Sequence, residues 1–142
     1  MTKDPKKPID CPSAQASAPG ARIYGAQTGA PDARRVGYLT ETLPVSEKLL
    51  GLAGPNKPTE IFRIAAPCMA SGCKHFNNGA CSLAQRIVEG LQPVVNALPT
   101  CQIRATCRWF HQEGKDACLR CPQIVTDVPN ASDHNKLIAG VA

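Results

Sequence analysis

Short apolar runs near the start of the chain predict small β elements. Ile23–Tyr24 and residues 36–39 are β-type runs joined by a long, turn-rich stretch, which predicts a modest hairpin. Alternating polarity over residues 60–64 predicts a third strand. Between them, Ser46 is a candidate N-cap for a short helix over residues 47–52, before a stretch rich in glycine and proline.

From Ser82 the apolar positions recur at steps of three and four, which is the spacing of one helix face. Pro99 would stop this helix, and Pro93 predicts a kink or a split near Leu91. A second helix is expected over residues 104–113, followed by Gly114 and a short turn over residues 116–120. Residues 68–81 contain too many turn formers for a regular element.

These patterns predict a flexible segment over residues 1–21, one cysteine-rich domain over residues 22–128 and a loose polar tail over residues 129–142. The expected fold class is α+β. A short N-terminal hairpin or three-strand region would be followed by two or three helices and cysteine-rich loops, with bound metal organising the domain.

Cysteine changes this picture most, because seven of the eight cysteines fall within the 54 residues from Cys68 to Cys121. Leu, Ile, Val and Phe together make up only 29 of 142 residues, so the core is thin. Such a chain is expected to need bridges, metal or a partner to fold. The sequence has no long apolar run and its first residues lack an apolar stretch. We therefore expect a cytoplasmic protein off the membrane, where metal or redox chemistry is favoured over disulfides.

The net charge of +5 is spread along the chain, and aromatic residues make up 4% of it. Proteins that bind nucleic acid usually cluster their basic residues and add stacking aromatics, so this pattern argues against that class. Five cations lie near the cysteines in sequence and could offset the charge of a thiolate site: Lys74, Arg86, Arg104, Arg108 and Arg120. Trp109 and Phe110 are expected to shield such a site.

All eight cysteines are candidate ligands, in two groups. The first group reads C-x4-C-x7-C (Cys68, Cys73, Cys81), and the second reads C-x5-C-x10-C-x2-C-P (Cys101, Cys107, Cys118, Cys121). Structural zinc prefers paired C-x2–4-C knuckles, of which only the last pair is one. Wider, uneven gaps favour an iron–sulfur cluster, whose several irons spread their ligands over a larger body.

The cysteines divide into two sets of four only if Cys11 joins the first group, so Cys11 decides between one site and two. His75 is a weaker candidate ligand, since a lone loop histidine is more often a hydrogen-bonding group. The sequence therefore predicts one or two [4Fe-4S] clusters that transfer electrons or sense redox state for a partner protein, as an electron carrier more than an enzyme. The alternatives are a zinc-stabilised module that binds protein or nucleic acid, and an enzyme with a partly open metal site.

Two stretches, APCMASGCKHFNNGACSLAQRIV and CRWFHQEGKDACLRCPQIVT, resemble a group of small bacterial cysteine-rich proteins sometimes labelled nitrogen fixation proteins. The resemblance covers roughly residues 61–126. It implies an iron–sulfur-like protein near redox metabolism, and it implies no role for any single residue.

Overall fold

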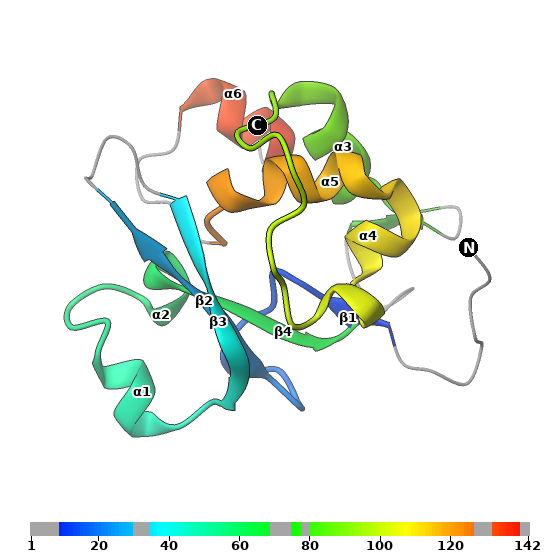
Figure 1. Ribbon diagram of the computed structural model, residues 1–142. Coiled ribbons are helices and arrows are strands. Elements are labelled where there is room, and N and C mark those ends of the chain that lie inside the picture. The colour runs from blue at the N-terminus through cyan, green and yellow to red at the C-terminus, as the bar shows by residue number, and fades with distance from the viewer. Residues whose placement is uncertain (1–8, 30–34, 69–74, 78–79, 127–131, 140–142) are drawn as a thin grey trace.

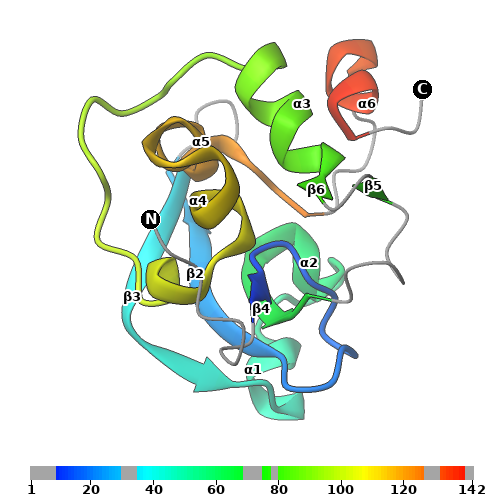
Figure 2. The same cartoon turned by 90° about the vertical axis from the view of Figure 1, so that its right-hand side faces the viewer.

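The computed structural model of the chain describes residues 9–29, 35–68, 75–77, 80–126 and 132–139. It combines a four-stranded antiparallel sheet, in the order β1-β4-β2-β3, with a group of short helices. Helices α3 to α6 gather on one side of the sheet, whereas α1 lies at its far end (Figures 1 and 2). The α+β class predicted from the sequence is confirmed.

The predicted hairpin forms from β2 (Arg22–Thr28) and β3 (Arg35–Pro44). The register shifts between Ile23 and Gly25, and there β2 lies very close to β3. A Cβ atom on Gly25 would stand only 2.7 Å from the Val36 side chain, so this position requires glycine. The third predicted strand is β4 (Phe62–Pro67), which pairs with β2 from the other side.

Residues 9–21, which the sequence placed in a flexible segment, instead contain a short strand that joins the sheet. Strand β1 (Asp10–Cys11) pairs with the end of β4, with Cys11 opposite Ala66. Asp10 is buried and accepts hydrogen bonds from Arg22 at 2.7 Å and from Thr106 at 2.6 Å. The buried carboxylate and its two partners fix this segment, which its polar, proline-rich composition did not predict.

Helix α1 (Glu47–Gly51) forms as predicted and is capped by the Ser46 hydroxyl, which accepts a hydrogen bond from the Leu49 amide. After the short helix α2 (Pro58–Ile61) and β4, helix α3 (Ser82–Gly90) ends just before the predicted break near Leu91. Residues 91–98, where the sequence predicted that the helix continues up to Pro99, are not helical. In the described part of the loop before α3, the chain forms the two-residue strands β5 (Phe76–Asn77) and β6 (Ala80–Cys81).

The predicted helix over residues 104–113 is wrong in one respect, because it is split at Cys107. A 3-10 turn, η2 (Arg104–Thr106), precedes α4 (Arg108–Glu113), and Cys107 between them is extended. The main chain at Cys107 forms a β-bridge with Asp10, which holds it out of the helix. Helix α5 (Lys115–Arg120) and the 3-10 turn η3 (Cys121–Gln123) follow.

The tail expected to be loose contains helix α6 (Asp133–Ala139), while residues 129–131 and 140–142 lie outside the described residues. The Ser132 hydroxyl accepts a hydrogen bond from the Asn135 amide and so caps α6. Arg86 on α3 donates to the Ile138 carbonyl at 2.7 Å, and the His134 ring bonds the Gly90 carbonyl. These polar contacts hold α6 against α3.

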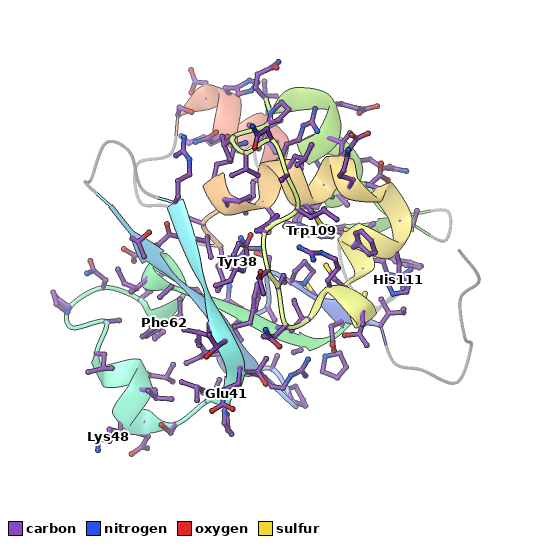
Figure 3. All side chains as sticks on the ribbon, viewed as in Figure 1. Tyr38, Glu41, Lys48, Phe62, Trp109 and His111 are labelled. Atoms are coloured by element: carbon purple, nitrogen blue, oxygen red, sulfur yellow. The ribbon has the colours of Figure 1, made fainter. Side chains whose placement is uncertain are left out.

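The core between sheet and helices is small, as the composition predicted. Its buried residues include Tyr24 from the sheet, Ile87 from α3 and Trp109 from α4, together with several alanines. Figure 3 shows Trp109 and Tyr38 between the helices and the sheet. Because alanines bury little area, these few large side chains supply most of the apolar burial.

Candidate functional site

The second cysteine group comes together around one small cavity. All four of its members line a space of about 20 Å³, which we call the small cavity: Cys101, Cys107, Cys118 and Cys121. The chain segments around them explain this convergence. Cys118 and Cys121 are three residues apart at the end of α5, and so share one side of that helix. Cys107 is the N-cap residue of α4.

Burial makes three of these thiols, Cys101, Cys107 and Cys118, weaker acids. It raises the pKa of Cys107 to about 12, against the opposing effect of hydrogen bonds from the Phe110 and Trp109 amides. Burial also raises the pKa of Cys101 and of Cys118, while Arg104 counteracts the shift at both. The charge of the Cys121 thiolate contributes to all three increases, so the four sulfur groups interact electrostatically.

Arg63 on β4 is the residue at this site that sequence reasoning missed. Its side chain is 0% exposed, and its guanidinium lies over the rings of Tyr24 and Trp109 at 5.4 and 5.6 Å. It donates hydrogen bonds to the carbonyls of Pro12, Cys121 and Ile124 at 3.0 to 3.3 Å. The sequence did contain a signal for Arg63, because it stands within the apolar run FRIAA. A charged residue at a strand position that is expected to be buried indicates a compensating partner.

No carboxylate lies within ion-pair distance of Arg63 in the described part of the chain. Burial pulls the pKa of Arg63 down, but electrostatic interactions with Cys121, Tyr24 and Tyr38 outweigh this effect and hold the pKa above its usual value. The guanidinium therefore stays charged.

Two further polar groups at the small cavity are buried without a hydrogen-bond partner among the described residues, the Tyr38 hydroxyl and Arg104 Nε. Burial and the neighbouring Cys121 thiol both raise the pKa of Tyr38. Arg104 is the member of the predicted cation set that lines this cavity. Both groups can donate a hydrogen bond to an acceptor placed among the thiols.

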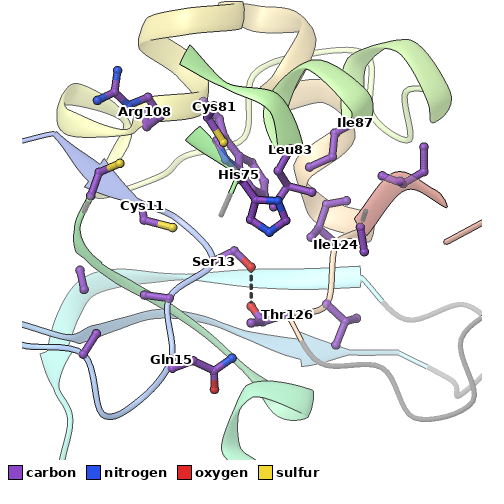
Figure 4. Close-up of a pocket in the computed structure, with 18 of the residues that line it drawn as sticks. Cys11, Ser13, Gln15, His75, Cys81, Leu83, Ile87, Arg108, Ile124 and Thr126 are labelled. Atoms are coloured by element: carbon purple, nitrogen blue, oxygen red, sulfur yellow. Dashed lines mark hydrogen bonds between the residues drawn. The ribbon is translucent and has the colours of Figure 1, made fainter. Parts of the chain in front are cut away.

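The first cysteine group lines a different space, the large cavity, of about 840 Å³. Cys11, Cys68 and Cys81 all contribute to its wall, whereas Cys73 lies outside the described residues. In Figure 4, Cys11 and Cys81 lie toward one end of the pocket and Ile87 and Ile124 toward the other. The structure therefore places Cys11 with the first group, as a division into two sets of four requires.

Cys81 is held by a side chain that the sequence did not single out. The Gln112 amide accepts a hydrogen bond from the Cys81 N–H at 2.7 Å and donates one to the Cys81 carbonyl at 2.8 Å. This paired contact fixes the main chain at the start of α3 against α4. Gln112 thus positions the thiol of Cys81 relative to the helices.

His75 also lines the large cavity, but its hydrogen bonding disfavours a role as metal ligand. Its Nδ1 lies 3.0 Å from the Arg86 guanidinium, which can only donate, so Nδ1 accepts and the neutral ring carries its proton on Nε2. Of the remaining predicted cations, Arg108 lines the large cavity and Arg120 donates to the Leu91 carbonyl. Lys74 lies outside the described residues.

Within the described ranges, no three His, Cys, Asp or Glu side chains are grouped tightly enough to hold a single metal ion. The same residues contain no helix long and apolar enough to cross a membrane. No family model, curated protein or solved structure matches the chain.

Proposed function

We propose that Cys101, Cys107, Cys118 and Cys121 bind an iron–sulfur cluster, of the [4Fe-4S] type, and that the protein transfers electrons to or from a partner protein. The observation that supports this most is the buried Arg63, which donates to the Cys121 carbonyl and lies over the Trp109 ring, with no carboxylate within ion-pair distance among the described residues. A buried charge is costly unless an opposite charge compensates it. A cluster bound by four thiolates carries net negative charge and would compensate Arg63.

The spacing of the ligands supports a cluster more than a single zinc ion. Structural zinc prefers paired C-x2–4-C knuckles, and the second group, C-x5-C-x10-C-x2-C, contains only one such pair. A four-iron cluster accepts ligands at wider and less even spacing along the chain. The small cavity, at about 20 Å³, has room for about one water, so a cluster requires the thiols to move outward.

The site in the small cavity is buried on one side and accessible from solvent on the other, which suits electron transfer to a partner. Trp109 is 2% exposed and Cys107 is 8% exposed, so this side of the site is shielded from water. Cys101, Cys118 and Cys121 are only partly buried. A partner would therefore dock over the partly exposed cysteines, while Arg63 and the aromatic rings set the potential of the cluster.

Anaerobic purification with iron, sulfide and zinc analysis tests the proposal. The wild-type protein should be brown and lose its visible absorption on reduction with dithionite. Cys118→Ser and Cys121→Ser should each lose iron and sulfide, whereas the exposed Ala105→Ser, which introduces the same hydroxyl, should keep both. A colourless protein containing only zinc, or full iron content in both cysteine variants, would contradict the proposal.

A further inference from the structure

The two cavities share a wall that is made of residues from β1 and from the start of α4. In β1, Cys11 lines the large cavity and the next residue, Pro12, lines the small one. At the start of α4, Cys107 lines the small cavity and Arg108 the large one, and Trp109 contributes to both. The β-bridge between Asp10 and Cys107 joins these two parts of the wall.

The register of β1 and β4 brings two thiols of the first group to one face of the sheet. Cys11 lies opposite Ala66, and Cys68 follows Ala66 by two residues, so Cys11 and Cys68 project to the same side. The Cys68 amide extends the pairing by donating to the Ile9 carbonyl at 2.7 Å. Such diagonal neighbours stand about 7–8 Å apart along the backbone, close enough for both thiols to reach one metal centre. The paired hydrogen bonds with the Gln112 amide hold the main chain of Cys81, which lines the same cavity.

The charge around the large cavity has one sign. Arg108 and Lys136 line it, and none of the described lining residues is an aspartate or glutamate. Arg108 Nε is buried without a hydrogen-bond partner among the described residues. A thiolate-bound cluster would supply the negative charge that this surface lacks.

We propose that Cys11, Cys68 and Cys81 bind a second iron–sulfur cluster at the sulfur-bearing end of the large cavity, and that electrons pass between the two clusters across the wall containing Trp109. This inference rests on the proposed cluster in the small cavity. A low-potential electron-carrier protein, or dithionite in its place, reduces one cluster by one electron. That cluster is reoxidised as the electron moves to the other, and no proton or bond is exchanged.

Iron and sulfide analysis of the full chain counts the clusters. The wild-type protein should hold about eight irons and eight sulfides, as two four-iron clusters require. Cys11→Ser and Cys68→Ser should each lose about half of both and keep the cluster of the small cavity, which also shows that the variant has folded. Ala14→Ser, a neighbour that lines the same cavity, should keep all of the iron.

Electron paramagnetic resonance tests whether the two clusters lie close to each other. In the fully reduced wild-type protein the two paramagnetic clusters should broaden each other's signal, and Cys11→Ser or Cys121→Ser should each leave a simple uncoupled spectrum. Unchanged iron content in both Cys11→Ser and Cys68→Ser, or an uncoupled wild-type spectrum with both clusters present, would overturn the inference. Loss of half of the iron in Cys11→Ser, with none lost in Cys121→Ser, would instead refute the cluster of the small cavity.

Discussion

Replacement of Arg63 by methionine removes the buried positive charge while keeping an unbranched side chain of similar length. In the cluster-free protein, the change removes the hydrogen bonds from Arg63 to three carbonyls, at about 1–3 kcal/mol each. The lower figure applies to the carbonyls of Pro12 and Cys121, because they still accept from the Tyr24 hydroxyl and the Ile124 amide. The change also removes a buried charge whose desolvation costs several kcal/mol. These opposing effects are similar in size. We therefore expect a change of less than about 2 kcal/mol in the free energy of unfolding without the cluster.

With the cluster bound, the two effects no longer cancel, because Arg63 then faces a negative charge. The guanidinium lies 3.0 Å from the Cys121 carbonyl, which places it on the order of 7 Å from the cluster. At an effective dielectric constant of about 20, two unit charges at that distance attract by about 2 kcal/mol. Reduction adds one negative charge, so Arg63→Met should lower the reduction potential by about 100 mV.

Anaerobic redox titration, followed by electron paramagnetic resonance, measures this shift. Arg63→Lys keeps the charge but cannot reach three carbonyls at once, so it should be less stable while its potential stays close to wild type. Arg35→Met, at an exposed position on β3, should leave the potential nearly unchanged because solvent screens that charge. An equal decrease in Arg63→Met and Arg63→Lys, or no decrease in Arg63→Met, would refute the electrostatic reasoning.

Three further predictions concern the stability of the cluster-free protein and the reduction potential of the bound cluster. Because the pKa of Cys107 is raised from 9.0 to about 12, its stabilising contribution is complete below pH 9. The free energy of unfolding of the cluster-free protein should therefore decrease by up to about 1.4 kcal/mol per pH unit between pH 9 and 12. In urea unfolding, Cys107→Ala should flatten this slope, and an unchanged slope would show that the thiol stays accessible to solvent in the folded protein. Asp10→Ala should cost about 2 kcal/mol, because it breaks the contacts to Arg22 and Thr106, and a cost near zero in thermal unfolding would mean that β1 is held by other contacts. Tyr38→Phe should leave the cluster-free protein equally stable or more stable, since the hydroxyl is unsatisfied, yet lower the potential of the bound cluster by removing a donor; a destabilised cluster-free variant would contradict this account.

Local signals in the sequence were enough to predict much of the fold. The β-type runs around Tyr24 and Tyr38 became the central hairpin, and Ser46 capped α1, because each depends on neighbouring residues only. Pro93 marked the break near Leu91, but the apolar spacing beyond it wrongly predicted more helix, because residues 91–98 are not helical. The tail helix α6 was missed although Ser132 and Asp133 form a capping signal, because its contacts to α3 join residues far apart in sequence: Arg86 donates to the Ile138 carbonyl, and the Ile138 side chain packs over Gly90.

The site was predictable only as a grouping of residues. Spacing separated the second group from the first, and the structure places the described members of each group at separate cavities. The position of Cys11 depends on pairing between residues far apart in sequence, Cys11 with Ala66 and Asp10 with Cys107, which no local pattern encodes. For the same reason, Arg63 and Gln112 became visible as site residues only through their tertiary hydrogen bonds.

X-ray absorption at the iron and zinc edges of anaerobically purified protein tests the central proposal most directly. The account predicts iron surrounded by sulfur, with a clear contribution from neighbouring irons. In Cys121→Ser the small-cavity cluster should be lost, and this contribution should decrease. Zinc bound to four sulfurs at about 2.3 Å, with no iron–iron contribution, would contradict it.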